Sequence, residues 1–377
     1  MTKKIFIAGS GGIGEAAALL LREWCEFELE IFLGDISEKG LNKAKDFVTA
    51  GSAKASAIHT VLMSPDSVTD EMRSAFDLCD VLLDCSPGGQ APRMARFAKD
   101  HGMHYANLTE YVAETDEIME LAKDADTGFI LQTGLAPGFI NVLAMSLYKK
   151  FVEQHKNENV ERIGMKVGAL TENAHAPHFY GFTWSPIGVA TEYVKNSRII
   201  RGGEIIEQKA LTDRERIVID SRIYEADLTS GGAADLPDFF NGKTRDLDYK
   251  TLRYVGHYDW VDGLIEKMDS ETDVPQKLEE IMINEVPSVE DDIVLVHSSV
   301  EGFDVNGRRR LIEKAYEIKP LLINGKSVRA IQTTTAGPLC ESAMMLLTGR
   351  YKGVVLQSRI DPEEFMSGTF ISKIYGS

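Results

Sequence analysis

KIFIA (Lys4–Ala8) followed by GSGGIG (Gly9–Gly14) carries the strongest structural signal in this 377-residue sequence. An apolar strand pattern ends in glycines, and an Ala/Leu-rich helical pattern follows over Glu15–Trp24. The glycine spacing GxGxxG allows a tight turn, close backbone approach to a pyrophosphate and close packing of helix on strand. The helix N-terminus adds N–H groups that attract phosphates. We therefore expect a dinucleotide to bind at Gly9, Ser10, Gly11, Gly12, Ile13 and Gly14.

Asp35 indicates which dinucleotide binds. It lies 21 residues after Gly14, at the end of a second strand pattern over Glu30–Leu33. A carboxylate at this place accepts hydrogen bonds from the adenosine ribose and repels a 2′-phosphate. Residues 36–38 contain no arginine that would neutralise such a phosphate, although Lys39 is near. The sequence therefore predicts NAD rather than NADP, with Ile36 beside the ribose.

The first third of the chain alternates strand and helix patterns. Further strand patterns occupy Ser56–Leu62, Asp80–Cys85, His104–Leu108 and Gly128–Gln132. This alternation predicts an α/β domain with a parallel, doubly wound sheet, a Rossmann domain over residues 1–133. Ligands of such sheets bind at the carboxyl ends of the strands. The cofactor is thus expected to pass Cys85, Ser86 and Pro87, although a plain strand-to-helix turn would also explain them.

The pattern changes after Pro137-Gly138. A helix is expected over Phe139–Phe151, and the strands beyond it are longer and joined by hairpins. Asn-Gly pairs at 306–307 and 324–325 are strong hairpin signals. Residues 134–330 are therefore expected to form an α+β domain with a mostly antiparallel sheet. The tail, residues 331–377, has a helical pattern over Gly337–Leu347 and is expected to pack back on the first domain.

Composition excludes several classes of protein. The formal net charge of -17 opposes binding to nucleic acid or to anionic membranes. The four cysteines form no CxxC pair, which argues against a zinc site and a disulfide framework. There is no signal-peptide pattern and no apolar stretch of roughly 18 residues. We expect a cytoplasmic protein without a metal.

Five segments together resemble a known family. They are GSGGIG at 9–14, TEYV at 109–112, GLAPGFINVLA at 134–144, FYGFTWSP at 179–186 and TLRYVGH at 251–257. In this order they resemble the saccharopine dehydrogenase superfamily and, within it, the lysine 6-dehydrogenases. The resemblance implies a Rossmann domain, an α+β domain for substrate binding and dimerisation, and NAD(P)-dependent chemistry at a C–N bond. It therefore also implies a homodimer.

Ala136 is a departure from part of that family. Glutamate-forming saccharopine reductases usually carry Asp in GLDPG, beside the substrate, whereas this chain has GLAPG, as lysine dehydrogenases do. Tyr111 matches a tyrosine that lies near substrate in the reductases. The resemblance thus implies a small amino acid with a second amine rather than saccharopine. Pro137 and Gly138 are expected to border the nicotinamide, although a domain linker would also explain them.

Three further residues are candidates for holding the substrate. Trp184 and Ser185 offer an apolar plane and a hydroxyl, although Ser185 could simply cap the helix that starts near Pro186. Arg253 is expected to clamp the α-carboxylate of an amino acid with two parallel hydrogen bonds. The alternative for Arg253 is a structural ion pair, in which case Arg201 or Arg222 would take the carboxylate.

The reaction expected from these residues is oxidative deamination of lysine or a related amino acid at its side-chain amine. The carbon bearing the amine passes a hydride to the nicotinamide, and Tyr111, His257 or water takes the proton of the ammonium. His257 is a candidate because an unperturbed histidine titrates near neutrality. One alternative is a saccharopine- or carboxyspermidine-type reductase, which needs a carbonyl co-substrate. Another is a non-catalytic NAD-binding protein, which would turn over no amine.

Overall fold

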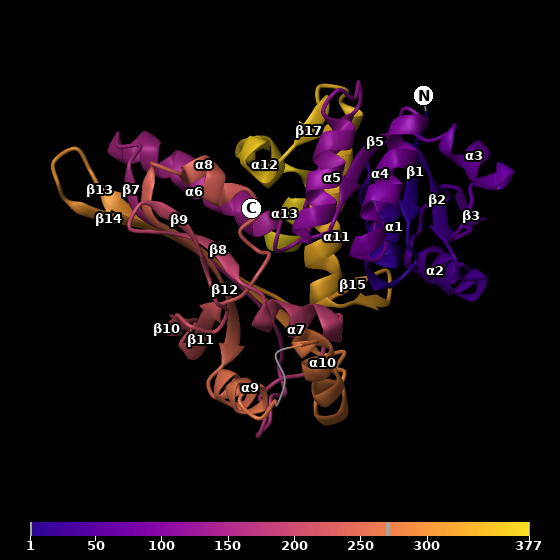
Figure 1. Ribbon diagram of the computed structural model, residues 1–377. Helices are drawn as coiled ribbons and strands as arrows, with labels where there is room; N and C mark the ends of the chain where they lie inside the picture. Colours follow the sequence, from indigo (N-terminus) through magenta and orange to yellow (C-terminus); the bar gives the residue numbers. More distant parts are fainter. Residues whose placement is uncertain (1, 269–271, 377) are drawn as a thin grey trace. The chain divides into compact units, whose positions relative to one another are not determined.

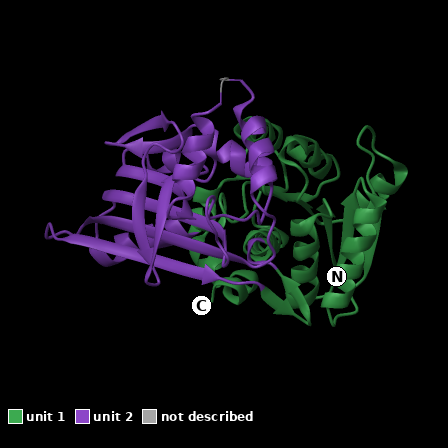
Figure 2. Ribbon diagram, turned by 90° about the horizontal axis from the view of Figure 1, so that it is seen from below, with its two compact units in different colours: residues 1–142, 321–328, 332–377 green, residues 143–320, 329–331 purple. Residues whose placement is uncertain are grey.

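The computed structural model describes residues 2–268 and 272–376 of the chain. It divides into two compact units, coloured separately in Figure 2. Unit 1 comprises residues 1–142, 321–328 and 332–377, and unit 2 comprises residues 143–320 and 329–331.

Unit 1 is built on a seven-stranded parallel sheet in the order β17-β6-β5-β4-β1-β2-β3. The strands are β1 (Lys3–Ala8), β2 (Leu29–Asp35), β3 (Ile58–Leu62), β4 (Val81–Asp84), β5 (His104–Asn107), β6 (Gly128–Ile130) and β17 (Gly353–Val355). The connecting helices, labelled in Figure 1, are α1 (Gly12–Trp24), α2 (Glu38–Gly51), α3 (Asp70–Phe76), α4 (Ala91–Asp100) and α5 (Val112–Ala122). The parallel, doubly wound sheet predicted from the sequence is confirmed.

The apolar composition of β1 explains its central place in this sheet. Ile5, Phe6, Ile7 and Ala8 are all fully buried, as a strand covered on both faces requires. β1 lies between β4 and β2, so the chain crosses in opposite directions on its two sides. Such a switch point opens a crevice at the carboxyl ends of the strands, where the glycine turn begins.

The C-terminal segment contributes to unit 1. The helix α11 (Ala330–Leu347) begins before the predicted Gly337, and β17 adds a strand beside β6. The segment ends in α12 (Pro362–Ser367) and α13 (Thr369–Tyr375). The ring of Tyr375 stacks on Phe139, with ring centroids 3.5 Å apart. Unit 1 therefore extends to Val142, beyond the boundary expected at residue 133, because the first turn of the next helix packs in it.

Unit 2 is built on an eight-stranded sheet in the order β10-β11-β12-β7-β13-β14, with β8 and β9 attached through β12. Only the β7–β12 pair is parallel among these strand pairs, which confirms the mostly antiparallel sheet. The strands are β7 (Val160–Thr171), β8 (Ser197–Arg201), β9 (Glu204–Gln208), β10 (Glu215–Ile219), β11 (Arg222–Leu228), β12 (Thr244–Tyr254), β13 (Asp292–Phe303) and β14 (Arg309–Ile318). The helices are α6 (Phe139–His155), α7 (Pro186–Val194), α8 (Leu236–Phe240), α9 (His257–Ile265) and α10 (Val274–Glu285).

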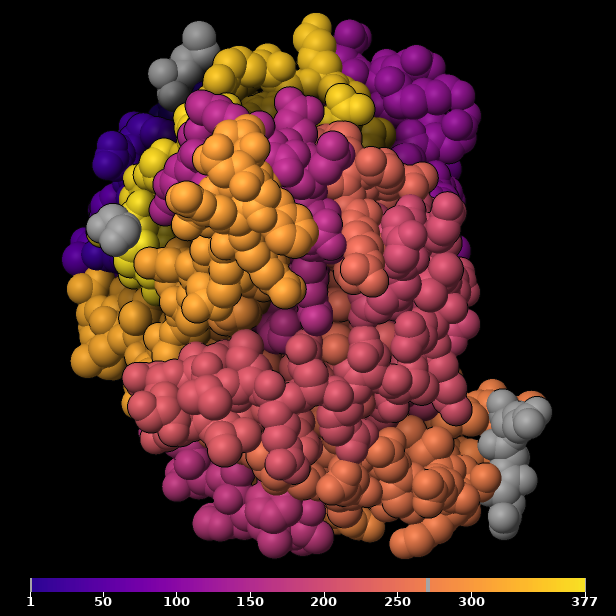
Figure 3. All heavy atoms as spheres, turned by 90° about the vertical axis from the view of Figure 1, so that its left-hand side faces the viewer, coloured from indigo at the N-terminus to yellow at the C-terminus, as the bar shows by residue number. Residues whose placement is uncertain are grey.

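Both predicted Asn-Gly hairpins are present. Gly307 has φ 74° between β13 and β14, and Gly325 has φ 83° between β15 (Leu321–Ile323) and β16 (Lys326–Val328). Asp304 fixes the first turn by accepting hydrogen bonds from the amides of residues 306 and 308. Val305 at the tip of this hairpin is 70% exposed, and the hairpin forms part of the orange surface in Figure 3.

Two further findings concern the whole described chain. None of the helices within residues 2–268 and 272–376 has the length and apolar character needed to cross a membrane. The four cysteines are free thiols; Cys85 is partly accessible and the other three are buried.

Candidate functional site

Two of the three motif glycines are required by the packing of unit 1 itself. Gly9 has φ 96°, and a Cβ there would lie 2.6 Å from the carbonyl oxygen of Cys85. A Cβ on Gly14 would lie 1.9 Å from the carbonyl oxygen of Gly9. Gly11 is different, since a Cβ there would meet no protein atom within 4 Å. Close approach of a ligand therefore explains Gly11, whereas packing does not.

The residues around Gly11 form a cradle for phosphate. Gly11 precedes α1 with extended backbone, φ -71° and ψ -172°, so the helix begins at Gly12 with its first amides directed out of the turn. These amides and the positive end of the helix dipole favour an anion. Ser10, Gly12 and Ile13 lie in the same turn, at the carboxyl end of β1. The turn fits the pyrophosphate of a dinucleotide.

The carboxylate of Asp35 is held in place at the end of β2. Its Oδ2 accepts hydrogen bonds from the backbone N–H of Ser10 at 2.7 Å and from the Ser10 hydroxyl at 2.9 Å. Its Oδ1 accepts one from the N–H of Ser37 at 2.9 Å. A carboxylate has about four acceptor positions, so one position remains for a ribose hydroxyl. Ile36 is 68% exposed beside it, and Lys39 is exposed in the first turn of α2.

Asp84, which the sequence analysis missed, shapes the turn after β4. Its side chain is 3% exposed and accepts hydrogen bonds from the Ser86 amide at 3.0 Å and the Tyr105 hydroxyl at 2.8 Å. Burial raises the pKa of this carboxyl group. The backbone of Cys85 lies against Gly9, and Pro87 opens the short helical turn at residues 88–90. The turns after β1 and β4 are therefore in contact.

Tyr111 lies on this same edge of the sheet. A Cβ on Gly88 would lie 2.9 Å from Cδ2 and Cε2 of the Tyr111 ring, so the ring rests on the turn that follows β4. Burial raises the pKa of Tyr111, and the charges of Glu110 and Glu114 raise it further. The hydroxyl therefore keeps its proton at neutral pH, which suits a hydrogen-bond donor better than the proton acceptor predicted from the sequence.

The loop at residues 134–138 owes its glycines to its own backbone. The N–H of Gly134 donates to the carbonyl oxygen of Pro137 at 3.0 Å, and the N–H of Gly138 donates to Asn141 Oδ1 at 2.7 Å. A Cβ on Gly138 would lie 2.1 Å from the carbonyl oxygen of Gly134. Ala136 is half-buried. This packing explains the glycines without a ligand, so contact of Pro137 and Gly138 with a cofactor stays a prediction.

In unit 2, Arg253 is a buried cation near the end of β12. It is 1% exposed, and its Nε–H donates to the Tyr193 hydroxyl at 2.7 Å while Nη1 donates to the carbonyl oxygen of Leu252 at 3.0 Å. The guanidinium lies over the ring of Tyr180, 4.8 Å from the ring centroid. Within the described part of the chain no carboxylate lies within 4.0 Å of it, and Glu192 acts on it from farther away.

Trp184 and Ser185 lie in unit 2 close to the tyrosines that surround Arg253. Trp184 packs with Tyr180 and Tyr193 in one apolar cluster, and its ring covers Gly188, where a Cβ would lie 2.3 Å from Cζ3. Ser185 caps α7, since its hydroxyl accepts a hydrogen bond from the Gly188 N–H at 3.4 Å. The Tyr180 hydroxyl is buried, and Trp184 is the hydrogen-bonding side chain beside it. The sequence could not predict that Tyr180 and Tyr193 lie beside Arg253, because they are far from it in the sequence.

The surroundings of His257 do not favour the role predicted for it, which stays a prediction. Its side chain is fully buried, with Nδ1 2.6 Å from the carbonyl oxygen of His178 and Nε2 2.9 Å from the Tyr193 hydroxyl. Burial, and then the charge of Arg253, lowers its pKa to about 3. A base that titrates near neutrality was expected, but both ring nitrogens are already engaged inside the protein.

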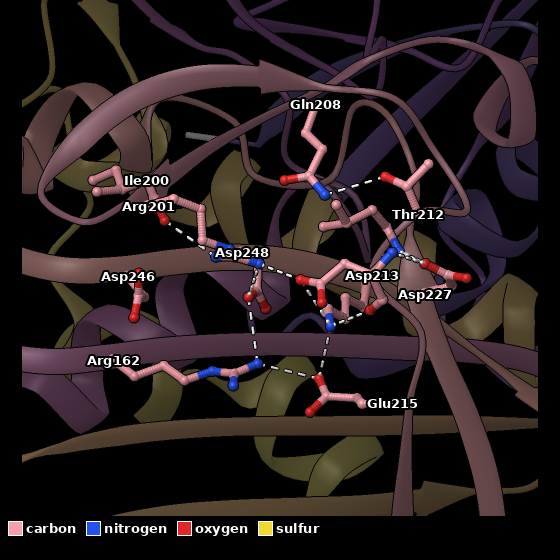
Figure 4. Close-up of polar contacts among 12 residues, drawn as sticks. Arg162, Ile200, Arg201, Gln208, Thr212, Asp213, Glu215, Asp227, Asp246 and Asp248 are labelled. Carbon is pink, nitrogen blue, oxygen red and sulfur yellow. Dashed lines mark hydrogen bonds and ion pairs between the residues drawn. The ribbon is translucent and has the colours of Figure 1, made fainter.

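The alternative arginines do not resemble Arg253. Arg222 begins β11 at an exposed position. Arg201 is already neutralised, since its Nη2 lies 2.6 Å from Asp213 Oδ2 and 2.7 Å from Asp248 Oδ2. It belongs to a sheet network of charges, most of which Figure 4 labels. This network comprises Arg162, Lys166, Arg201, Lys250, Asp213, Glu215 and Asp248.

Among residues 2–268 and 272–376, no three His, Cys, Asp or Glu side chains are grouped in a way that could hold a metal ion.

Comparison with known proteins gives two family models and several relatives. Residues 5–131 match the saccharopine dehydrogenase NADP binding domain, and residues 134–371 match the saccharopine dehydrogenase C-terminal domain. Over 208 residues the chain is 24% identical to the mitochondrial alpha-aminoadipic semialdehyde synthase of Rattus norvegicus. That match covers 54% of this chain but only 21% of the synthase.

Two solved structures share the fold over nearly the whole chain. The L-Glu-forming saccharopine dehydrogenase of Saccharomyces cerevisiae matches with a TM-score of 0.73 and 13% identity, covering 99% of this chain and 98% of that one. The homospermidine synthase of Legionella pneumophila, solved with NAD, matches with a TM-score of 0.69 and 11% identity, covering 100% and 90%. At such identities the likeness concerns the fold alone.

Proposed function

Because the chain belongs to the saccharopine dehydrogenase family, whose nicotinamide-dinucleotide-binding domain it contains, we propose that it is an NAD-dependent dehydrogenase of the lysine 6-dehydrogenase type. Its reaction would be oxidative deamination of lysine, or a close analogue, at the side-chain amine. Cytoplasmic location and a homodimer remain part of this proposal.

The observation that supports it most is the buried guanidinium of Arg253, which has no carboxylate within 4.0 Å among the described residues, Glu192 acting on it only from farther away. A buried cation without a partner carries a large desolvation cost, and arginine cannot relieve that cost by losing its proton. The α-carboxylate of an amino acid would supply the missing charge and accept two parallel hydrogen bonds. A diamine or an uncharged amine would leave the cost in place.

Ala136 supports a small substrate rather than saccharopine. An acidic side chain at this place could pair with a basic group of a two-armed substrate, and alanine can make no such pair. A carboxylate would also hold a nearby amine as ammonium, which has no lone pair to support the departing hydride. Its absence suits direct oxidation of a primary amine.

Asp35 supports NAD as the cofactor, although the matching family model is described as NADP binding. The Ser10 amide and hydroxyl hold the carboxylate in place, and a 2′-phosphate bound beside it would be repelled by its charge. When bound, the dinucleotide would be held through its pyrophosphate by the glycine turn and through its adenosine ribose by Asp35, and its nicotinamide would supply the hydride acceptor.

The proton of the ammonium passes to water in this proposal. Tyr111 keeps its proton because its pKa is raised, and His257 is buried with its nitrogens engaged. Tyr111 can still donate a hydrogen bond to substrate. The substrate amine must therefore lose its own proton to solvent, which makes turnover rise with pH.

A spectrophotometric screen for NADH formation tests the proposal. Lysine, ornithine, saccharopine and polyamines would each be offered with NAD or NADP, with and without 2-oxoglutarate, between pH 7 and pH 9. We expect turnover of lysine with NAD alone, rising about tenfold per pH unit because a lysine amine titrates near pH 10.4. Formation of NADH from saccharopine but not from lysine would instead support a saccharopine-type reductase. If no amine is turned over, the result would support a non-catalytic NAD-binding protein.

A further inference from the structure

We propose that Tyr193 and His257 are positioning residues that fix the guanidinium of Arg253 in one orientation for an anionic ligand. The inference deepens the proposed function, because it assigns the residues that prepare Arg253 for the substrate carboxylate. It depends on a hydrogen-bond chain within unit 2 in which every proton has a defined place.

The chain begins at the carbonyl oxygen of His178. A carbonyl oxygen can only accept, so the Nδ1 of His257, 2.6 Å away, must carry a proton. Burial keeps the ring neutral, and Nε2 is therefore an acceptor. The tautomer of His257 thus follows from its surroundings.

The chain continues through Tyr193 to Arg253. The Tyr193 hydroxyl lies 2.9 Å from Nε2 of His257 and must donate its proton there. Its oxygen is then free to accept from the Nε–H of Arg253 at 2.7 Å. A hydroxyl whose proton was directed at Arg253 instead would face a cation that has only donors. The three side chains are at most 1% exposed, so water does not compete for these bonds.

The hydrogen-bond chain uses only part of the donor capacity of Arg253. Two of its five N–H groups donate within the protein, to Tyr193 and Leu252, which leaves three for a ligand. The ring of Tyr180 beneath the guanidinium restricts the plane in which they point. A free arginine side chain loses rotamer entropy when a ligand fixes it in one orientation. Holding it beforehand therefore lowers the cost of binding a carboxylate.

The four residues of the hydrogen-bond chain come from different elements of unit 2. Tyr193 comes from α7, Arg253 from β12 and His257 from the first turn of α9, while His178 lies in the segment between β7 and α7. Gly256, with φ 96°, turns the polypeptide between Arg253 and His257.

A positioning role and a purely structural role for Tyr193 predict different results. A purely structural role predicts that removing the Tyr193 hydroxyl lowers stability and leaves the substrate preference unchanged. A positioning role predicts that the preference for a substrate with a carboxylate falls.

The first test measures kcat/KM for lysine and for 1,5-diaminopentane, which is lysine without its carboxylate. In Tyr193→Phe we expect the ratio of the two values to fall about tenfold, chiefly through the KM for lysine. Tyr258→Phe is the matched control, since it removes a buried hydroxyl that donates to the Thr251 carbonyl in the same cluster. The control should keep the ratio. An equal ratio in Tyr193→Phe and wild type would overturn the proposal.

A pair of His257 variants tests the direction of the chain. The oxygen of glutamine reaches the position of Nε2 and can accept from Tyr193, whereas asparagine replaces only the Nδ1 side of the ring. We expect His257→Gln to keep more of the preference for lysine than His257→Asn. Neither should move a kinetic pKa near neutrality. Loss of a wild-type limb between pH 6 and pH 7 in both variants would instead make His257 an acid–base catalyst.

An activity-independent measurement separates this proposal from the proposed function. With ¹⁵N-labelled histidine and arginine, NMR should show the Nδ1-protonated tautomer of His257 from pH 5 to pH 9. The Arg253 Nε–H should exchange at least tenfold faster in Tyr193→Phe than in wild type. An unchanged exchange rate of the Arg253 Nε–H, or the Nε2-protonated tautomer of His257, would contradict the proposed hydrogen-bond chain even in an active enzyme. If the wild type does not distinguish lysine from the diamine, the proposed substrate is wrong, and this measurement still tests whether the hydrogen-bond chain exists.

Discussion

Two groups of buried cations in unit 2 differ in whether neighbouring carboxylates neutralise their charges. The sheet network holds Lys166 and Lys250 almost fully buried, yet each is within 3.3 Å of a carboxylate oxygen of Glu215, and Asp248 neutralises Arg201 and Arg162. Arg253 is as deeply buried but has aromatic rings and hydroxyl and carbonyl oxygens around it.

In the proposed function, this difference separates charges that only stabilise the fold from the charge that binds a ligand. Charges that satisfy one another, as in the sheet network, need nothing from outside and hold strands together. The network even lowers the pKa of Glu215 to about 2, chiefly through Lys166, Lys250 and Arg162 acting against the burial of the carboxylate. Arg253 has no carboxylate in direct contact among the described residues, and Glu192 acts on it only from farther away. Changes in the network should therefore cost stability, and changes at Arg253 should cost substrate binding.

The largest effect is expected when the sheet network is broken. Asp248→Ala removes a fully buried carboxylate from between Arg162 and Arg201 and should cost about 3–5 kcal/mol of unfolding free energy in denaturant titration. The lysine-to-diamine preference of the folded fraction should be kept. Asp238→Asn is the control, because its pair with Arg198 is exposed and should contribute less than about 1 kcal/mol. Equal losses in the two variants would contradict the distinction.

Glu341 contrasts with Arg253, because a buried carboxyl group without a cationic partner can become neutral by binding a proton. It is 6% exposed in α11, accepts a hydrogen bond from the Phe370 N–H at 3.0 Å, and burial raises its pKa from 4.5 to about 7. Between these values the folded state binds the extra proton, so stability falls as pH rises through this window and stays low above it. Glu341→Gln should remove up to roughly 3 kcal/mol of that dependence.

The Glu341 measurement compares unfolding free energies at pH 5 and pH 8. Wild type should lose more stability between the two values than Glu341→Gln does. Parallel pH profiles for the two proteins would show that Glu341 is ionised in the folded state at both values.

Replacing Arg253 tests whether its charge stabilises the fold, because a stabilising charge and a ligand-binding charge predict stability changes of opposite sign. Arg253→Met keeps an apolar stem and removes the unpaired charge, so stability should be unchanged or higher. Loss of a buried partner of a carboxylate should lower kcat/KM for lysine by roughly a hundredfold or more. NAD affinity, measured by fluorescence titration, should stay the same. A strongly destabilised variant with full kcat/KM would place Arg253 with the structural charges.

The smallest effect is expected at the cofactor. Asp35→Ser with Ile36→Arg removes one anionic charge and adds a cation, and should raise the NADP/NAD preference at least tenfold, about 1.4 kcal/mol. Cofactor titrations of both proteins measure it. A wild type that already prefers NADP would show that Asp35 does not repel the 2′-phosphate.

The sequence predicts the elements of unit 1 well because their signals are local. The strand before Gly9, the helix after Gly14 and the strand that ends at Asp35 each follow from hydrophobic pattern and turn residues. The hairpins at residues 306–307 and 324–325 follow from Asn-Gly in the same way. Ser185 was correctly considered as a helix cap.

Burial and long-range contact limited the rest. His257 has an ordinary neutral-range pKa in isolation, and only its burial beside Arg253 lowers it. Tyr193 and His257 are 64 positions apart, so no spacing could reveal their hydrogen bond. Asp84 similarly depends on Tyr105 from the neighbouring strand. Such partners become visible only once the strands are placed side by side.

The most direct test of the central claim, that Arg253 binds the carboxylate of the substrate, is one ratio on the wild-type protein. With NAD present at pH 9, kcat/KM would be measured for lysine and for 1,5-diaminopentane. The two amines differ only in the carboxylate, so a bidentate clamp should favour lysine at least a hundredfold, about 2.7 kcal/mol. A ratio near one would contradict the account, because the buried guanidinium would then have no part in choosing the substrate.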